Sequence, residues 1–257
     1  AFIKACELDK NDTTSLFYLG SCYNRAGQKD LAIEKFKEVI EKRPDYLEVY
    51  KNLSMIYIEL NQIDNAIEIL NSAINNPNIE PDYTLYYILA TVNMLKKDYN
   101  KAIEALLRAN CENPYYPPVV NSLASCYMNI NQYKEALNLL LDLFDKDKNN
   151  SLTTYNIGIC YQVLNDYKKA LEFFQLAYQL EPTTTMLATM ANCAFQAQDF
   201  QLALSLYQNL ISVYPNNTDY RLAYIECLEM TYNYELALEN INLLLLLDEK
   251  NVNLIKK

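Results

Sequence analysis

Apolar residues recur every three or four positions along most of the chain, a spacing that is typical of amphipathic helices. A small residue returns inside this pattern at nearly constant intervals. Seven alanines are spaced 34, 36, 34, 34, 33 and 34 residues apart, at Ala32, Ala66, Ala102, Ala136, Ala170, Ala203 and Ala237. Each stands in a similar phrase, such as DLAIEKF or KKALEFF. The pattern predicts a helix that occurs seven times, with the alanine near its start.

A second helix is predicted in front of each alanine. Twelve positions earlier stands another small residue, at Gly20, Ser54, Ala90, Ala124, Gly158 and Ala191, with Ile225 as the exception. Three positions further on, most units carry a large side chain, at Tyr23, Tyr57, Tyr127, Tyr161 and Leu228, whereas two units carry Asn93 and Ala194. Prolines after most of the alanine helices end them and begin the next unit. Each unit is therefore predicted to be a pair of helices, each about 20 Å long.

This unit resembles the tetratricopeptide repeat, which has a period of 34 residues and small, aromatic, alanine and proline positions at these places. The resemblance implies an all-α fold, a right-handed superhelical solenoid of stacked antiparallel helix hairpins with about seven repeats. One hairpin cannot bury its own apolar face, so hairpins stack on their neighbours. The predicted repeats are 13–46, 47–82, 83–116, 117–150, 151–183, 184–217 and 218–251. Residues 1–12 are expected to be the second helix of a preceding repeat, and 252–257 the start of a further helix or cap.

The chain departs from the family pattern in three places. It has no tryptophan, so the early tryptophan of the family is replaced by Leu16, Tyr50, Tyr86, Val120, Thr154, Leu187 and Arg221. The second repeat carries two extra residues around INNPNIEP. The last helix, ELALENINLLLLLDEK, is apolar nearly all round, and we expect a further helix or a partner to cover it.

Composition argues against an active site in this segment, and we expect no enzyme, cofactor or metal. The chain has no histidine, which excludes histidine-based acid–base chemistry and zinc sites that need imidazole. With only 3 glycines it has no glycine-rich phosphate loop. The net charge of −10 argues against nucleic acids and anionic membrane surfaces as partners. No apolar run is long enough to span a bilayer and no signal peptide is visible, so we expect a reducing, cytoplasmic location.

Five cysteines share one position, two residues after the small residue of the first helix: Cys22, Cys126, Cys160, Cys193 and Cys227. Equivalent positions in adjacent repeats should lie roughly 10 Å apart, which is too far for a disulfide. We therefore expect these cysteines to be small buried packing residues. A redox or metal-binding role is the alternative.

Members of this family bind peptides along the concave side, which the first helices line, and the resemblance implies the same here. The lining positions form a predicted groove of apolar residues with scattered amides, suited to a helix or an extended segment of a partner. They are Phe17, Asn24, Lys51, Met55, Ile58, Tyr87, Thr91, Met94, Asn121, Met128, Tyr155, Ile159, Gln162, Asn192 and Phe195. The alternative is ordinary packing between repeats, above all for Met94, Leu95 and Val163 near the helix ends.

The resemblance implies a non-enzymatic scaffold that holds a partner protein within a larger assembly. Abundant Asn, Lys, Ile and Tyr fit an AT-rich protist genome, and for that reason we expect a ciliary or transport complex. One alternative is that the repeats present substrate to a catalytic domain elsewhere in a longer protein. Another is a co-chaperone, although only Lys51 and Asn52 match the carboxylate clamp of such members, since Met55, Thr84 and Ile88 hold its other places. An RNA-reading helical array is disfavoured by the acidic charge.

Overall fold

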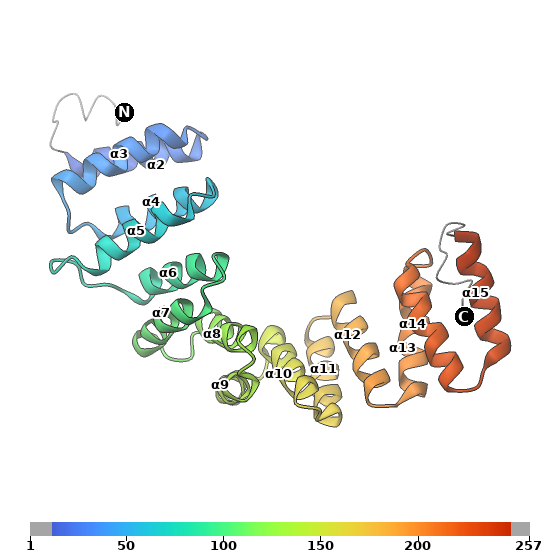
Figure 1. The fold of residues 1–257 in the computed structure, drawn as a ribbon. Coiled ribbons are helices and arrows are strands. Elements are labelled where there is room, and N and C mark those ends of the chain that lie inside the picture. Colours follow the sequence, from blue (N-terminus) through green and yellow to red (C-terminus); the bar gives the residue numbers. More distant parts are fainter. Residues whose placement is uncertain (1–11, 248–257) are drawn as a thin grey trace. The chain divides into compact units, whose positions relative to one another are not determined.

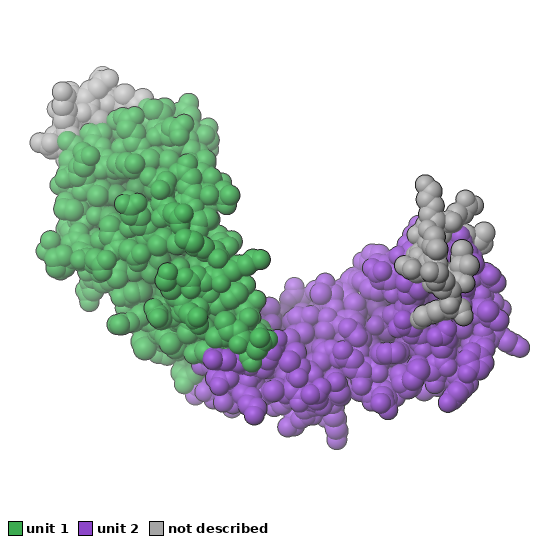
Figure 2. Space-filling model, viewed as in Figure 1, with its two compact units in different colours: residues 1–131 green, residues 132–257 purple. Residues whose placement is uncertain are grey.

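The computed structural model describes residues 12–247, and every regular element in this range is an α-helix (Figure 1). The chain divides after Asn131 into two compact units (Figure 2). The predicted half-repeat at 1–12, except Asp12, and the predicted further helix at 252–257 lie outside the described residues.

The helices alternate with short connections along the chain. The first unit holds α2 (Thr13–Arg25), α3 (Lys29–Lys42), α4 (Leu47–Glu59), α5 (Ile63–Ile74), α6 (Tyr83–Leu95), α7 (Tyr99–Glu112) and α8 (Pro117–Asn129). The second unit holds α9 (Tyr133–Lys146), α10 (Ser151–Val163), α11 (Tyr167–Leu180), α12 (Thr184–Gln196), α13 (Phe200–Val213), α14 (Thr218–Met230) and α15 (Tyr234–Leu247). These fourteen helices of the described range make up seven tetratricopeptide-like helix pairs, as the sequence pattern predicts.

Within each unit, each helix packs on its neighbours in the sequence. In the first unit α2 packs on α3, α4 on α5, and α6 on α7, while α3 meets α4, α5 meets α6, and α7 meets α8. The first helices of adjacent repeats also contact one another, α2 with α4 and α4 with α6. In the second unit, contacts run in the same way from α9 to α15. Each unit is therefore a stack of hairpins that share their apolar faces.

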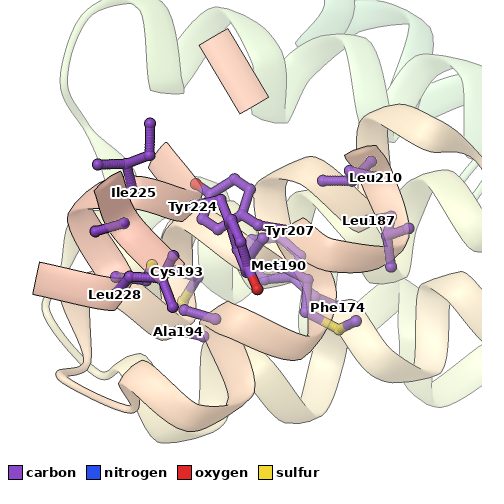
Figure 3. Close-up of a cluster of buried hydrophobic side chains, with 14 of the residues drawn as sticks. Phe174, Leu187, Met190, Cys193, Ala194, Tyr207, Leu210, Tyr224, Ile225 and Leu228 are labelled. Carbon is purple, nitrogen blue, oxygen red and sulfur yellow. The ribbon is translucent and has the colours of Figure 1, made fainter. Parts of the chain in front are cut away.

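The repeated alanines lie inside the stack. Ala32, Ala66, Ala102, Ala136, Ala170 and Ala203 are fully buried, and Ala237 is 3% exposed. The position four residues later fills the same layer with a large side chain, such as Phe36, Leu70 or Phe174, each fully buried. Figure 3 shows this layer in the second unit, where Phe174 lies among Leu187, Met190 and Tyr207. The small residues allow close helix approach and the large ones fill the remaining volume.

The turn inside each hairpin repeats one backbone conformation. A single residue after the first helix takes a positive φ, between 56° and 77°, at Gly27, Asn61, Lys97, Asn131, Asn165, Gln198 and Tyr232. The next residue often donates its N–H back across the turn, as Gln28 does to the Tyr23 carbonyl at 2.9 Å and Asp166 to the Tyr161 carbonyl at 2.9 Å. This left-handed cap ends one helix and directs the chain into the next.

The last described helix keeps apolar side chains at its surface. Leu236, Leu238 and Leu243 of α15 are 42%, 60% and 48% exposed. The positions equivalent to Leu238 in earlier repeats, such as Ile67 and Leu171, are partly buried against their cores. The apolar surface that the sequence indicates for this helix is therefore present among the described residues.

Candidate functional site

We define the first-helix face as the side of α2, α4, α6, α8, α10, α12 and α14 that carries the predicted groove positions. Since the groove positions fall in both units, each unit is described separately. In the first unit the most polar part of this face is built around Lys51. Its Nζ lies 2.5 Å from Glu48 Oε1, 2.9 Å from Asp82 Oδ2 and 3.1 Å from Thr84 Oγ1. This network joins α4 to the start of α6.

The Lys51 network is satisfied within the chain. Partial burial lowers the pKa of Lys51, but hydrogen bonds to Glu48 and Asp82 outweigh it, so the pKa lies above its ordinary value. Asn52 is also engaged, because its amide donates to the Glu48 carbonyl at 2.8 Å. Both residues that match a carboxylate clamp are therefore already bonded to groups of their own repeat. This arrangement disfavours capture of a partner's terminal carboxylate here.

Several other predicted groove residues of the first unit serve packing. The Phe17 ring lies 5.6 Å from the Phe36 ring and 5.1 Å from the Tyr46 ring, and Ile58 packs against the same core. Asn24 accepts a hydrogen bond of 2.5 Å from Lys29. These side chains connect α2, α3 and α4, and they offer a partner only part of their surface.

Asn121 does not lie in an accessible groove, contrary to the sequence-based expectation. It is only 6% exposed, and its amide donates to the Pro117 carbonyl one turn earlier at 3.0 Å. An amide that is buried against its own helix is satisfied locally and cannot present itself to a partner.

The accessible part of the first-helix face in this unit is largely apolar. Met55 is 45% exposed and Leu95 is 56% exposed. Thr91 is exposed as well, and its hydroxyl donates a hydrogen bond to the Tyr87 carbonyl at 2.9 Å. Tyr87, Met94 and Met128 are half-buried. The exposure of Leu95 is inconsistent with the alternative that it is a core residue.

In the second unit, two predicted groove residues of α10 form hydrogen bonds with side chains of α12, the next first helix. The Tyr155 hydroxyl lies 2.9 Å from Thr189 Oγ1, and the Gln162 amide donates to Gln196 Oε1 at 2.7 Å. Because these two repeats are 33 residues apart, each contact joins a residue of α10 to the position one residue beyond its equivalent in α12. Ile159 and Phe195 are partly buried against the core. Asn192 is exposed.

Two apolar side chains of α10 remain open to solvent. Leu152 is 53% exposed and Val163 is 45% exposed. Val163 is therefore no core residue, which removes the packing alternative at this position. Together with Asn192, these side chains belong to the accessible part of the first-helix face in the second unit.

The cysteines behave as packing residues in four of five repeats. Cys126, Cys160, Cys193 and Cys227 are fully buried, and burial raises the pKa of Cys160 to about 12 and those of the other three to about 11. Such thiols stay protonated and unreactive at neutral pH. The six cysteines of the described range are all free.

Cys22 is exposed, so the expectation of burial is wrong at this position. In α12 the equivalent Cys193 points toward the Tyr167 carbonyl of the preceding repeat, at 4.0 Å. Cys22 lies in α2, the first helix of the described range.

A pocket of about 600 Å³ lies between α5, α6 and α7 in the first unit. Apolar side chains of all three helices line it, including Ile67, Ile74, Leu89 and Ala105. The Asp64–Lys96 ion pair, at 2.6 Å, stands at its edge. The sequence pattern did not predict this pocket. The one signal was Asn93, which occupies a position that is tyrosine in most repeats and which lines the pocket.

Within the described residues, no cluster of three or more acidic or cysteine side chains could hold a metal ion. The same part of the chain contains no helix that is long and apolar enough to cross a membrane.

Family models of the tetratricopeptide repeat match residues 7–83 and 94–154, residues 153–184, and residues 189–249. The first match alone covers more than half of the chain, and the chain belongs to the tetratricopeptide repeat family. The fold agrees with the C-terminal part of a TPR repeat-containing protein from Cytophaga hutchinsonii. The TM-score is 0.76 at 20% identity, over 93% of this chain and 98% of that one.

Two further proteins are similar to this chain. The chain is 27% identical over 139 residues to the bovine (Bos taurus) BBSome complex member BBS4. The matched residues make up 53% of this chain and 26% of that protein. The match therefore spans about a quarter of the bovine protein. The structure of YrrB, described as a TPR protein with an unusual peptide-binding site, has a TM-score of 0.63 at 21% identity. That likeness covers 72% of this chain and 95% of YrrB.

Proposed function

We propose that this chain is a non-enzymatic scaffold that holds a segment of a partner protein against its first-helix faces. The observation that carries the proposal is the exposure of apolar side chains there. Met55, Leu95, Leu152 and Val163 are 45–56% exposed, and all four lie on first helices. Exposed apolar side chains on a folded surface mark sites of interaction when they gather on one element or face.

The chemistry of these faces suits an apolar or amphipathic segment. Met55 is flexible and polarisable, so it adapts to partner side chains of different shape. Thr91 and Asn192, both exposed, add hydrogen-bonding groups beside the apolar side chains. The charged Lys51 network is satisfied internally, which favours an apolar segment over an acidic tail.

We also propose that the chain is a subunit of a multiprotein assembly associated with the cilium. The similarity to a BBSome complex member supports this, as does the expectation from amino-acid usage. Tetratricopeptide scaffolds are generally non-catalytic, and the absence of histidine from the whole chain agrees with that role.

The test is quantitative affinity purification of the native protein, with partners measured by mass spectrometry. Met55→Glu combined with Leu95→Glu places two charges on the first-helix face of the first unit. We expect this variant to recover at least one major partner at less than a tenth of the wild-type amount. Val213→Glu is the matched control, because Val213 is 61% exposed on a second helix, α13. A second double variant, Leu152→Glu with Val163→Glu, tests the second unit in the same way. The proposal would be overturned if both double variants recovered every partner in the wild-type amount.

A further inference from the structure

The pocket between α5, α6 and α7 is best understood by comparing the third repeat with the fifth. Around the fifth repeat, four side chains, one of them from the fourth repeat, form a continuous chain of contacts. The Phe144 and Phe173 rings lie 5.5 Å apart, the Phe173 and Tyr161 rings 5.6 Å apart, and Lys169 Nζ lies 5.0 Å from the centre of the Tyr161 ring. These residues come from α9, α10 and α11, all within the second unit.

The positions equivalent to these four residues line the pocket of the third repeat. Positions are counted from the alanine or small residue of each repeat. By this count Ile74 is equivalent to Phe144, Ala105 to Phe173, Asn93 to Tyr161 and Lys101 to Lys169. Three rings are thus replaced by an isoleucine, a methyl group and an amide, while the lysine is retained. The space of about 600 Å³ is what the missing rings leave between otherwise similar helices. In the sixth repeat, where Leu206 holds the place of Ala105, the corresponding hollow is about 290 Å³.

We infer that this pocket is a second docking site, which takes an aromatic side chain next to an acidic residue on a protein partner. The fifth repeat shows what this place accommodates, namely an aromatic ring with a lysine ammonium over its face. Lys101 is placed to make the same cation–π contact with a ring supplied from outside. The apolar walls at Ile67, Ile74 and Leu89 give the ring its contact area.

Arg108 supplies the preference for an acidic neighbour. Its position holds no positive charge in any other repeat, where the chain has Glu38, Ser72, Asp142, Leu176, Asn209 and Leu243. Arg108 is exposed and forms no ion pair with any residue in the described range. A guanidinium at the edge of an apolar pocket matches a carboxylate by paired, charge-assisted hydrogen bonds. The lining holds three basic side chains, Lys96, Lys101 and Arg108, and two acidic ones, Asp64 and Glu104.

The pocket is separate from the first-helix face. Successive residues of an α-helix are rotated by about 100° around its axis. By this rotation, two sets of α6 residues point in mean directions about 150° apart: the pocket residues Tyr86, Leu89 and Asn93, and the groove residues Tyr87 and Thr91. One partner segment on the first-helix face would leave the pocket open. The inference therefore stands or fails independently of the proposed function.

The test is fluorescence anisotropy with a labelled heptapeptide that has one central tyrosine flanked by two aspartates. The same peptide with alanine in place of tyrosine is the comparison. We expect saturable binding of the tyrosine peptide and at least tenfold weaker binding of the alanine peptide. The double variant Asn93→Tyr, Ala105→Phe rebuilds the ring pair of the fifth repeat. It should weaken binding of the tyrosine peptide at least tenfold. Arg108→Glu should weaken binding of the tyrosine peptide at least threefold. Lys37→Glu makes an equal charge change at an exposed site on α3 and should leave this binding unchanged.

The location is checked by methyl chemical shifts, which should move at Ile67 and Ile74 and not at Met55. Circular dichroism melting shows that the variants are folded, and Arg108→Glu supplies a surface substitution that leaves the packing intact. Three results would overturn the inference: no saturable binding, equal binding of the two peptides, or full binding by both the refilled pocket and Arg108→Glu.

Discussion

Gly158 and Phe174 illustrate how one pair of residues sets the distance between two helices. A Cβ added at Gly158 would lie 2.6 Å from Phe174 Cδ1, and one at Gly20 would lie 2.8 Å from Phe36 Cε1. Repeats that have leucine at the aromatic position carry a larger residue opposite it: Ser54 with Leu70, Ala90 with Leu106, and Ala124 with Leu140. In these five repeats the two positions vary together because they share one volume, whereas the sixth repeat pairs Ala191 with Tyr207 and the seventh pairs Ile225 with Ile241.

We predict that Gly158→Ala destabilises the protein by about 1–2 kcal/mol, because overpacking against Phe174 exceeds the gain in helix propensity. Adding Phe174→Leu should recover much of this loss, since it reproduces the pairing found in the third and fourth repeats. Urea denaturation of the wild type, both single variants and the double variant measures the coupling. Strictly additive losses would contradict the shared-volume explanation.

At the level of the helix, acidic and amide caps show why several of the elements begin where they do. Asp82 Oδ1 accepts from the Leu85 N–H at 2.9 Å, and the same carboxylate bonds Lys51 and Thr84. It therefore ends the longer connection of the second repeat, starts α6 and ties it to α4. Asp98, Asp166 and Asp199 cap α7, α11 and α13 in the same way.

We predict that Asp82→Ala lowers the free energy of unfolding by about 1–2 kcal/mol, the usual cost of losing an N-cap. Asp82→Asn is the matched variant, because asparagine retains the cap and loses only the charge that Lys51 faces. Its loss should be less than half that of alanine. Equal losses for both variants in thermal or urea unfolding would show that the cap contributes little.

The same carboxylate predicts a pH dependence. Burial raises the pKa of Asp82, but hydrogen bonds from Thr84 and Lys51 outweigh it, so the folded pKa lies below the ordinary value. A depressed pKa contributes stability above the unfolded pKa of about 3.9, and this contribution is lost as the pH falls through the folded pKa. The difference between wild type and Asp82→Asn should therefore be constant from pH 7 to about pH 5 and shrink below pH 4.

The helices and their register could be predicted from sequence, whereas the pocket could not. The alanine spacing reports a position that must be small in every repeat, and such a position is visible without coordinates. The pocket depends on what is missing at two places twelve residues apart, Asn93 and Ala105, and on Ile74 in the repeat before. Its volume follows only when three helices are brought together.

Side-chain pairing along the first-helix faces was also beyond the sequence pattern. The register places Lys51, Tyr155 and Gln162 on these faces, but it does not show that Asp82, Thr189 and Gln196 already engage them. Such contacts depend on rotamers and on the offset between adjacent first helices. The predicted groove residues that stay accessible are therefore a subset of those the register selects.

For the molecule as a whole, contacts run mainly between helices that are neighbours in the sequence, so we predict that damage stays local. In a stack of this kind stability is a sum over repeats and their interfaces. Gly158→Ala should raise hydrogen exchange in α10, α11 and α12 and leave α2–α5 unchanged, as measured by mass spectrometry of backbone amides. A uniform rise across all described helices would mean that the chain unfolds as one cooperative body.

The left-handed turn residue that closes the first helix of every repeat has a practical consequence. These turn residues share one backbone geometry, so the chain has seven equivalent positions at which repeats could be joined. They are Gly27, Asn61, Lys97, Asn131, Asn165, Gln198 and Tyr232. A cassette of 34 residues cut at two of them would leave both ends with matching direction. The array could in this way be shortened, lengthened or shuffled by gene assembly without the redesign of any joint.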